Sequence, residues 1–218
     1  MAHQANENIP TVCFTFEPNS LLNASVYRHA QNATAGFLKL SNSHSPAYTI
    51  SSTTSIASTR TVFKDAYNRV LAQIDRKDLA KDTIALHDFQ GGDKLLKAKK
   101  INEWLSDESG CIGCIESMIY GELIWRFDEN FNMILCAQND PHRILARAEQ
   151  LSHLPISESF TPLKATPMVS VYSLTASPEF ELQVLTSFTY LEHKMRLERK
   201  STMLSIAVSQ YDARVRMG

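Results

Sequence analysis

Four cysteines are the residues whose type and spacing could most readily do chemistry. Cys111 and Cys114 form a CxxC pair, and Cys136 and His142 follow downstream. Structural zinc is held tetrahedrally by four Cys or His ligands, and a CxxC turn presents two thiolates to one ion. The sequence therefore offers Cys111, Cys114, Cys136 and His142 as a Cys₃His zinc set. Two features weigh against it, because Cys136 falls in a predicted strand and His142 has no second ligand nearby in the sequence.

A redox role for the CxxC pair is the alternative interpretation. It needs a helix N-terminus to lower the pKa of one thiol, and the residues after Cys114 are typical of a strand. Burial as small apolar side chains is the commonest state of such cysteines. We therefore expect no cofactor, with zinc as the exception to test.

No catalytic motif stands out in the sequence. It contains no nucleophile elbow, P-loop or dinucleotide fingerprint. Glu116 and Glu122 share strand parity and could form a carboxylate pair, but nothing selects them over a solvated surface. We predict a non-enzymatic protein, and we keep a small enzyme or zinc-containing module centred on Cys111, Cys114 and Cys136 as the alternative.

Lysine and arginine residues gather in two short segments, each on a predicted helix. Phosphate binding requires several cations on one face, since each contact releases counterions. The predicted nucleic-acid contacts are Lys94, Lys97 and Lys100 in the first segment and Lys194, Arg196, Arg199, Lys200 and Arg214 in the second. The other interpretation is that both segments are solvated faces of amphipathic helices.

The last forty residues contain two apolar stripes with seven-residue spacing, which is typical of helices that pack on a partner. The predicted interface consists of Val184, Phe188, Leu191 and Met195 in the first stripe and Leu204, Val208 and Tyr211 in the second. The stripes are offset, because the first would continue into polar Glu198 and Thr202. We therefore predict two helices or a marked bend near Ser201. Packing against the protein's own sheet explains the apolar spacing of this segment equally well.

Composition and charge place the chain among ordinary folded proteins. Its 218 residues are 44% hydrophobic and 21% charged, with a net charge of −1, and this predicts no general attraction to anionic surfaces. Residues 61–100 carry nine basic and six acidic residues, whereas residues 101–160 carry three basic and ten acidic ones. This asymmetry predicts one basic and one acidic side.

The elements that must position these residues are predicted from periodicity and turn signals. Strands are expected over 11–17, 83–89 and 168–174, and hairpins over 36–52 and 118–137. Helices are expected over 21–35, 60–77 and 93–105, from Asp140, and from Pro178. We predict an α+β fold, a mixed or antiparallel sheet with amphipathic helices and a long helical C-terminal segment. Residues 1–160 would form the α+β core, and residues 161–218 would pack on it as part of a single domain.

The predicted location and partners follow from what the sequence lacks. No apolar run approaches the roughly 20 residues of a membrane-spanning helix, and the first ten residues are polar, so we expect a cytoplasmic protein without a membrane partner. The predicted function is that of a self-associating regulatory or nucleoprotein-assembly protein, a homo-oligomer that binds DNA or RNA. A structural subunit of a larger particle is a further alternative.

Overall fold

The computed structural model describes residues 10–18, 20–30, 45–78, 80–92, 94–106, 111–117, 119–149, 167–172 and 177–217. For Lys200 and residues 203–217 it describes the path of the helix and not the side chains.

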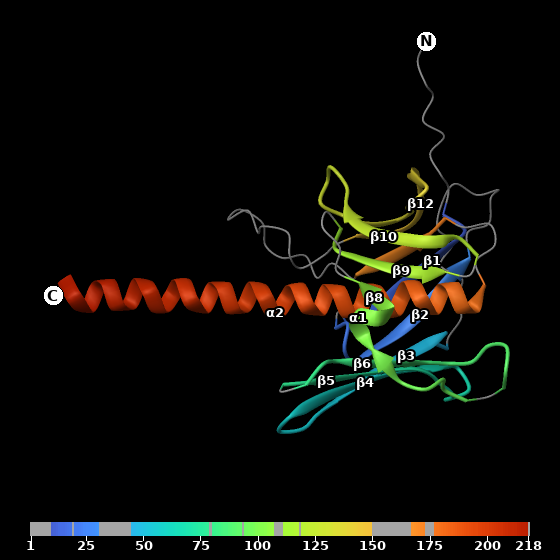
Figure 1. Cartoon of the computed structure of the whole chain (residues 1–218), viewed down its shortest axis with the longest axis horizontal. Coiled ribbons are helices and arrows are strands. Elements are labelled where there is room, and N and C mark those ends of the chain that lie inside the picture. The colour runs from blue at the N-terminus through green and yellow to red at the C-terminus, as the bar shows by residue number, and fades with distance from the viewer. Residues whose placement is uncertain are drawn as a thin grey trace, which may run out of the picture.

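A single antiparallel sheet of 13 strands makes up most of the fold (Figure 1). Its first run of neighbours is β1 (Val12–Glu17), β2 (Ala24–Ala30), β3 (Tyr48–Thr54), β4 (Ser58–Asp65), β5 (Val70–Lys77), β6 (Thr83–Leu86) and β7 (Lys99–Lys100). Its second run is β8 (Leu105–Ser106), β9 (Gly113–Ser117), β10 (Gly121–Phe127), β11 (Met133–Ala137) and β12 (Asp140–Glu149). The last strand, β13 (Met168–Val171), pairs with β12 and β1 and so joins the two runs.

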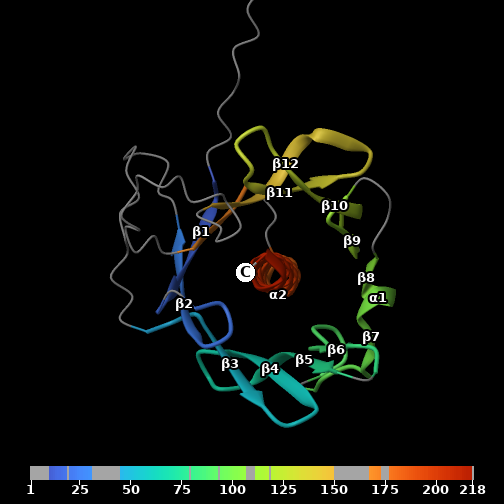
Figure 2. The same cartoon turned by 90° about the vertical axis from the view of Figure 1, so that its left-hand side faces the viewer.

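The sheet curves around a central helix, α2 (Pro178–Met217), as Figure 2 shows in the view along the helix axis. The two edge strands, β7 and β8, are separated in the chain only by the single-turn helix α1 (Ile101–Trp104). α1 therefore connects the two edges of the curved sheet. Its side chains Ile101 and Trp104 are buried in the same core.

The core lies between the inner face of the sheet and the first part of α2. Every residue from Phe180 to Thr189 is buried, as are Leu191 and Glu192. Phe188 packs between strands from both runs, with ring centroids 5.9 Å from Phe16 on β1 and 6.5 Å from Trp125 on β10. Burying aromatic and aliphatic side chains in this way is the main stabilising term of such a core.

Polar side chains inside the core join α2 to the sheet at three levels. Near the start of the helix, Arg28 donates to Glu181 at 2.8 Å and the Tyr48 hydroxyl donates to the same carboxylate at 3.2 Å. Farther along, Trp125 Nε1 donates to Ser187 Oγ at 2.9 Å. These bonds offset the cost of burying polar groups in a helix that is enclosed on every side.

The third polar contact lies near the end of the enclosed part of α2. There the Tyr190 hydroxyl donates to Asp82 at 3.1 Å. Asp82 lies immediately before β6, which runs beside the edge strand β7. This bond fixes the helix to the lysine-rich edge of the sheet.

The predicted α+β class is wrong, because the structure has one large antiparallel sheet and one long helix. Most of the predicted internal helices are strands. Residues 21–35 contain β2, the segment that follows Asp140 is β12, and the helix predicted over 93–105 is reduced to the four residues of α1. The C-terminal segment is one continuous helix through Ser201.

The helix predicted over residues 60–77 is the β4–β5 hairpin. Its apolar residues are spaced so that Phe63, Leu71 and Ile74 reach the core from two strands, whereas Tyr67 is exposed at the turn. Asp65 Oδ1 accepts the backbone N–H groups of Tyr67 and Arg69, each at 2.9 Å. Such Asx turns compete with helix formation. The chain therefore forms a hairpin here, although its apolar residues recur at the three- and four-residue spacing of a helix.

Several predicted elements are confirmed. β1, β6 and β13 fall within the predicted strands, and β10 and β11 form the hairpin expected around Asp128-Glu129-Asn130. α2 begins at Pro178, as expected, and Ser177 Oγ accepts the Phe180 N–H at 3.1 Å, as an N-cap serine does. Residues 36–40, the first strand of the other predicted hairpin, lie outside the described residues.

Within the described part of the chain, no helix combines the length and apolar character that crossing a membrane requires.

Candidate functional site

The CxxC pair lies where the chain enters β9. Cys111 is half-buried in the bend before the strand, Cys114 is buried within it, and their Sγ atoms are 2.8 Å apart. The Ile112 N–H donates to the Trp125 carbonyl at 2.8 Å, and Cys114 pairs with Ile124 on one side and with Ser106 on the other. The backbone of the pair is therefore held by strands on both sides.

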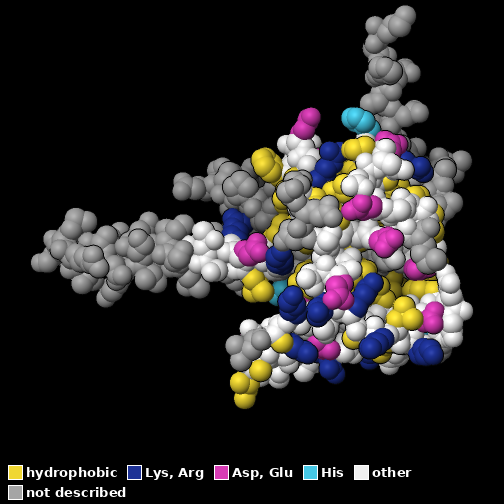
Figure 3. All heavy atoms as spheres, viewed as in Figure 1, with side chains coloured by type: hydrophobic (Ala, Val, Ile, Leu, Met, Phe, Trp, Pro, Cys, Tyr) yellow, Lys and Arg dark blue, Asp and Glu magenta, His cyan; other side chains and the backbone are white. Residues whose placement is uncertain are grey.

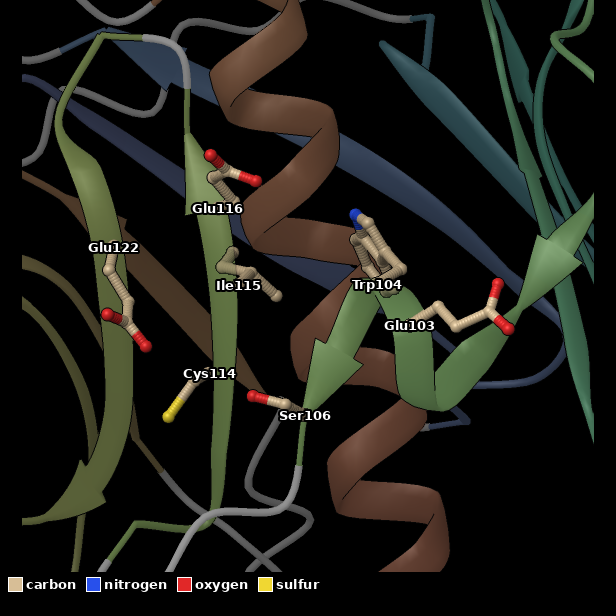
Figure 4. A pocket seen from close by; sticks show the side chains of 7 residues that line it. All are labelled: Glu103, Trp104, Ser106, Cys114, Ile115, Glu116 and Glu122. Carbon is tan, nitrogen blue, oxygen red and sulfur yellow. The ribbon is translucent and has the colours of Figure 1, made fainter.

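A hollow of about 310 Å³ opens beside this pair, between α1, β8, β9 and β10 (Figure 4). Three carboxylates and four uncharged side chains line it, namely Glu103, Glu116, Glu122, Trp104, Ser106, Cys114 and Ile115. Its acidic lining favours a cation over an anion. In the described part of the chain, however, no three His, Cys, Asp or Glu side chains come close enough to hold a metal ion.

The carboxylates of Glu116 and Glu122 belong to directly opposed residues of β9 and β10. Their shared strand parity, noted from the sequence, therefore makes them cross-strand neighbours on the outer face of the sheet. Like charges placed directly opposite each other destabilise a strand pair. Neither carboxylate has a described hydrogen bond to a histidine or a hydroxyl that would mark it as an acid–base catalyst.

The four residues of the predicted zinc set are not brought together. Cys114 pairs with Ile124, and Ile124 pairs with Cys136, so Cys136 lies two strands away. At a strand spacing of about 4.8 Å, this separation is about 10 Å, too far for both thiolates to bind one zinc ion. His142 is exposed near the start of β12. Burial raises the pKa of the Cys136 thiol, and a hydrogen bond with Arg126 only partly offsets it.

The first predicted group of nucleic-acid contacts lies on extended chain and not on a helix. Lys94, Lys97 and Lys100 are exposed, and Lys100 belongs to the edge strand β7. Lysines on an edge strand discourage pairing with another sheet, which is a structural reason for their presence. Lys100 also forms an exposed ion pair with Glu103 at 3.4 Å.

The second predicted group lies on α2 where the helix leaves the sheet. Arg196 forms an ion pair with the buried carboxylate of Glu192 at 2.9 Å, and Lys194 and Arg199 are half-buried. Lys200 and Arg214 have side chains outside those that the structure describes. This group is therefore partly occupied by contacts within the chain.

The two segments of opposite charge balance lie apart in the fold. β4 and β5, from the basic segment, lie on the opposite side of α2 from β11 and β12, from the acidic segment (Figure 2). On the face shown in Figure 3, Lys and Arg side chains gather over the region of α1 and β4–β6.

The first stripe of the predicted interface is core. Val184, Phe188 and Leu191 are at most 2% exposed, and Met195 packs against the same core. The protein's own sheet covers them, so they are not available to a second copy in this fold. The side chains of Leu204, Val208 and Tyr211, in the second stripe, lie outside those described.

α2 continues well beyond the sheet (Figure 1). The change in surroundings occurs at Leu197, which is 51% exposed, and Glu198, Ser201 and Thr202 are exposed as well. We call residues 197–217 the projecting segment. At about 1.5 Å per residue it adds about 30 Å of helix outside the sheet.

The comparisons with known proteins identify a family and no function. A model described as a family of unknown function (DUF6593) matches residues 29–197, well over half of the chain. The chain belongs to this family. No curated protein and no solved structure matches it.

The DUF6593 match begins in β2 and ends at Leu197. Its end coincides with the residue at which α2 leaves the sheet. The matched region therefore contains most of the sheet and the enclosed part of α2, and residues 198–217 lie beyond it.

Sequence reasoning missed the polar residues that fix α2 inside the sheet. Arg28, Tyr48 and Glu181 are widely separated in the chain and meet only in the folded protein. A signal was present in Glu181, Thr186, Ser187 and Glu192, because polar residues occur on every side of the segment from Phe180 to Glu192. When such a helical segment is buried, its polar side chains need hydrogen-bonding partners on every side.

Proposed function

We propose that this is a non-enzymatic, cytoplasmic protein that self-associates through the projecting segment of α2 and offers basic residues to an anionic partner such as nucleic acid. The observation that carries the proposal is the change at Leu197, where a helix enclosed by its own sheet becomes exposed and continues for about 20 residues.

The spacing of apolar residues in the projecting segment supports a coiled coil. Leu197, Leu204 and Tyr211 occupy equivalent positions seven residues apart, and Val208 and Val215 follow Leu204 and Tyr211 by four residues each. Leucine at d with a β-branched residue at a favours parallel two-stranded coiled coils. Leu197 is the first residue of this spacing. Its side chain is exposed, whereas the side chain of Leu191 is buried.

The charge of the same segment supports an anionic partner. Residues 197–217 carry four Lys or Arg and two acidic residues, Glu198 and Asp212. A parallel dimer would place two such segments side by side and double their positive charge. Additional cations strengthen phosphate binding, because each contact releases counterions. Lys94, Lys97 and Lys100 offer a second exposed basic group.

Light scattering on the full chain tests the self-association. We expect a mass twice the 24.5 kDa of one chain, and a mass of one chain for Leu204→Glu and Val208→Glu. Gln210→Glu is the matched control, because its position lies away from the seam, and it should keep the dimer mass. A wild-type mass of one chain at every concentration measured would contradict the proposal.

Duplex DNA binding over a range of salt concentrations tests the anionic partner separately. We expect the logarithm of the binding constant to fall linearly with the logarithm of salt concentration. The double variant Arg214→Glu/Arg216→Glu should weaken binding and reduce this slope by about one per lost phosphate contact. Lys81→Glu, on the exposed connection between β5 and β6, is the control. Absence of binding at low salt would remove this half of the proposal.

A further inference from the structure

The backbone around Cys111 and Cys114 is fixed on the face that meets α2. An added Cβ on Gly113 would lie 2.9 Å from Leu105 Cδ1 and 3.3 Å from Leu191 Cδ2. Gly113, the second of the two residues between the cysteines, therefore lacks room for a side chain, because the strand lies close to Leu105 of β8 and to Leu191 of α2. With Ile112 bonded to Trp125 and Cys114 paired on both sides, the two sulfur atoms are held in a defined arrangement.

The distance between the two sulfurs suits a disulfide better than a metal. Two thiolates on one tetrahedral zinc are about 3.8 Å apart, given Zn–S bonds of about 2.3 Å. The Sγ atoms of Cys111 and Cys114 are already at 2.8 Å, and a disulfide bond is about 2.05 Å long. The separation of the two sulfurs is therefore nearer to that of a disulfide than to that of two zinc ligands.

The four thiols differ in their access to an oxidant. Cys111 is half-buried, whereas Cys13, Cys114 and Cys136 are at most 4% exposed. Burial also raises the pKa values of Cys13 and Cys136, so these two form the reactive thiolate less readily. Cys111 is therefore the thiol that a small oxidant reaches first, and Cys114 is the thiol in position to resolve it.

We propose that Cys111 and Cys114 form a reversible dithiol–disulfide site whose oxidant is hydrogen peroxide. The Cys111 thiolate attacks one peroxide oxygen, the O–O bond breaks, and the other oxygen leaves as water, giving a sulfenic acid. The Cys114 thiolate then attacks this sulfur, forms the S–S bond and releases a second water. Two thiols lose two electrons and two protons, and one peroxide becomes two waters.

Intact-mass analysis of the full chain tests this site directly. The protein is treated with a small excess of hydrogen peroxide, denatured and alkylated. We expect two of the four cysteines to resist alkylation, a peptide map that links Cys111 to Cys114, and recovery of all four thiols after reduction. The variant Cys111→Ser should lose the linkage and keep three alkylated cysteines. Cys136→Ala is the matched control and should keep the linkage.

Three results would overturn the inference. They are alkylation of all four wild-type cysteines after peroxide treatment, a linkage that involves Cys13 or Cys136, and one equivalent of zinc in the purified protein that must be chelated before the pair oxidises. The wild-type peptide map decides the question even where a variant does not fold.

Discussion

From Phe180 to Glu192, α2 is enclosed by the sheet, whereas Leu197 and the residues just after it are exposed (Figures 1 and 2). Both parts belong to one uninterrupted helix. The enclosed part carries buried polar groups such as Glu181, Ser187 and Glu192, each bonded within the chain. The projecting segment carries a narrow apolar seam and basic residues. The comparison teaches that the first half of the helix builds the fold, whereas the second half lies beyond the sheet, which is why we propose a partner for it.

Replacing a leucine in each part of the helix should give the largest difference in the free energy of unfolding. Leu191→Ala removes a side chain that is 2% exposed, and Leu197→Ala removes one that is 51% exposed. We expect the free energy of unfolding to fall by about 2–5 kcal/mol for Leu191→Ala and by less than about 0.5 kcal/mol for Leu197→Ala. Urea denaturation at low protein concentration measures both. Equal losses would mean that the two parts have the same surroundings.

Ser187→Ala removes one of the hydrogen bonds that join the enclosed part of α2 to the sheet. The Trp125 indole N–H would lose its acceptor in the core. Leaving a buried donor without a partner costs about 1–3 kcal/mol, and urea denaturation should show this loss. Ser201→Ala, at an exposed position of the same helix, is the control and should leave the unfolding free energy nearly unchanged. A loss of the same size in both variants would argue against a stabilising role for this hydrogen bond.

Tyr48→Phe should give the smallest effect, and one that depends on pH. Burial and the nearby Glu181 carboxylate raise the pKa of Tyr48 above its usual value of about 10. The folded protein therefore holds the phenol proton after the unfolded chain has released it, and stability falls as pH rises above about 10. The wild-type unfolding free energy should decline faster between about pH 9 and 11 than that of Tyr48→Phe. Parallel declines would show that Tyr48 is not the group responsible.

Part of this molecule could be predicted from the sequence because the signals were local. The start of α2 at Pro178 was predicted, but its length was not, because the offset of the two apolar stripes favoured two helices or a bend near Ser201 where the structure has one helix. The CxxC spacing alone indicated that Cys111 and Cys114 would lie together, and the structure places them so.

The rest depended on contacts between distant residues. The seven-residue stripe of Val184, Phe188 and Leu191 has the same spacing whether a sheet or a second helix covers it, so the sequence could not distinguish the two. The separation of Cys114 from Cys136 follows from the β9–β10–β11 register. The turn at Asp65 was a local signal, but the apolar spacing around it suited a helix equally well.

Hydrogen exchange along α2 at low and high protein concentration tests the central claim most directly. We expect strong protection of the amides from 180 to 192 at both concentrations, because the sheet encloses them. We expect the amides from 198 to 217 to become protected only at the higher concentration, where the dimer forms. Exchange of residues 198–217 that does not change with concentration, or rapid exchange of residues 180–192, would contradict the account.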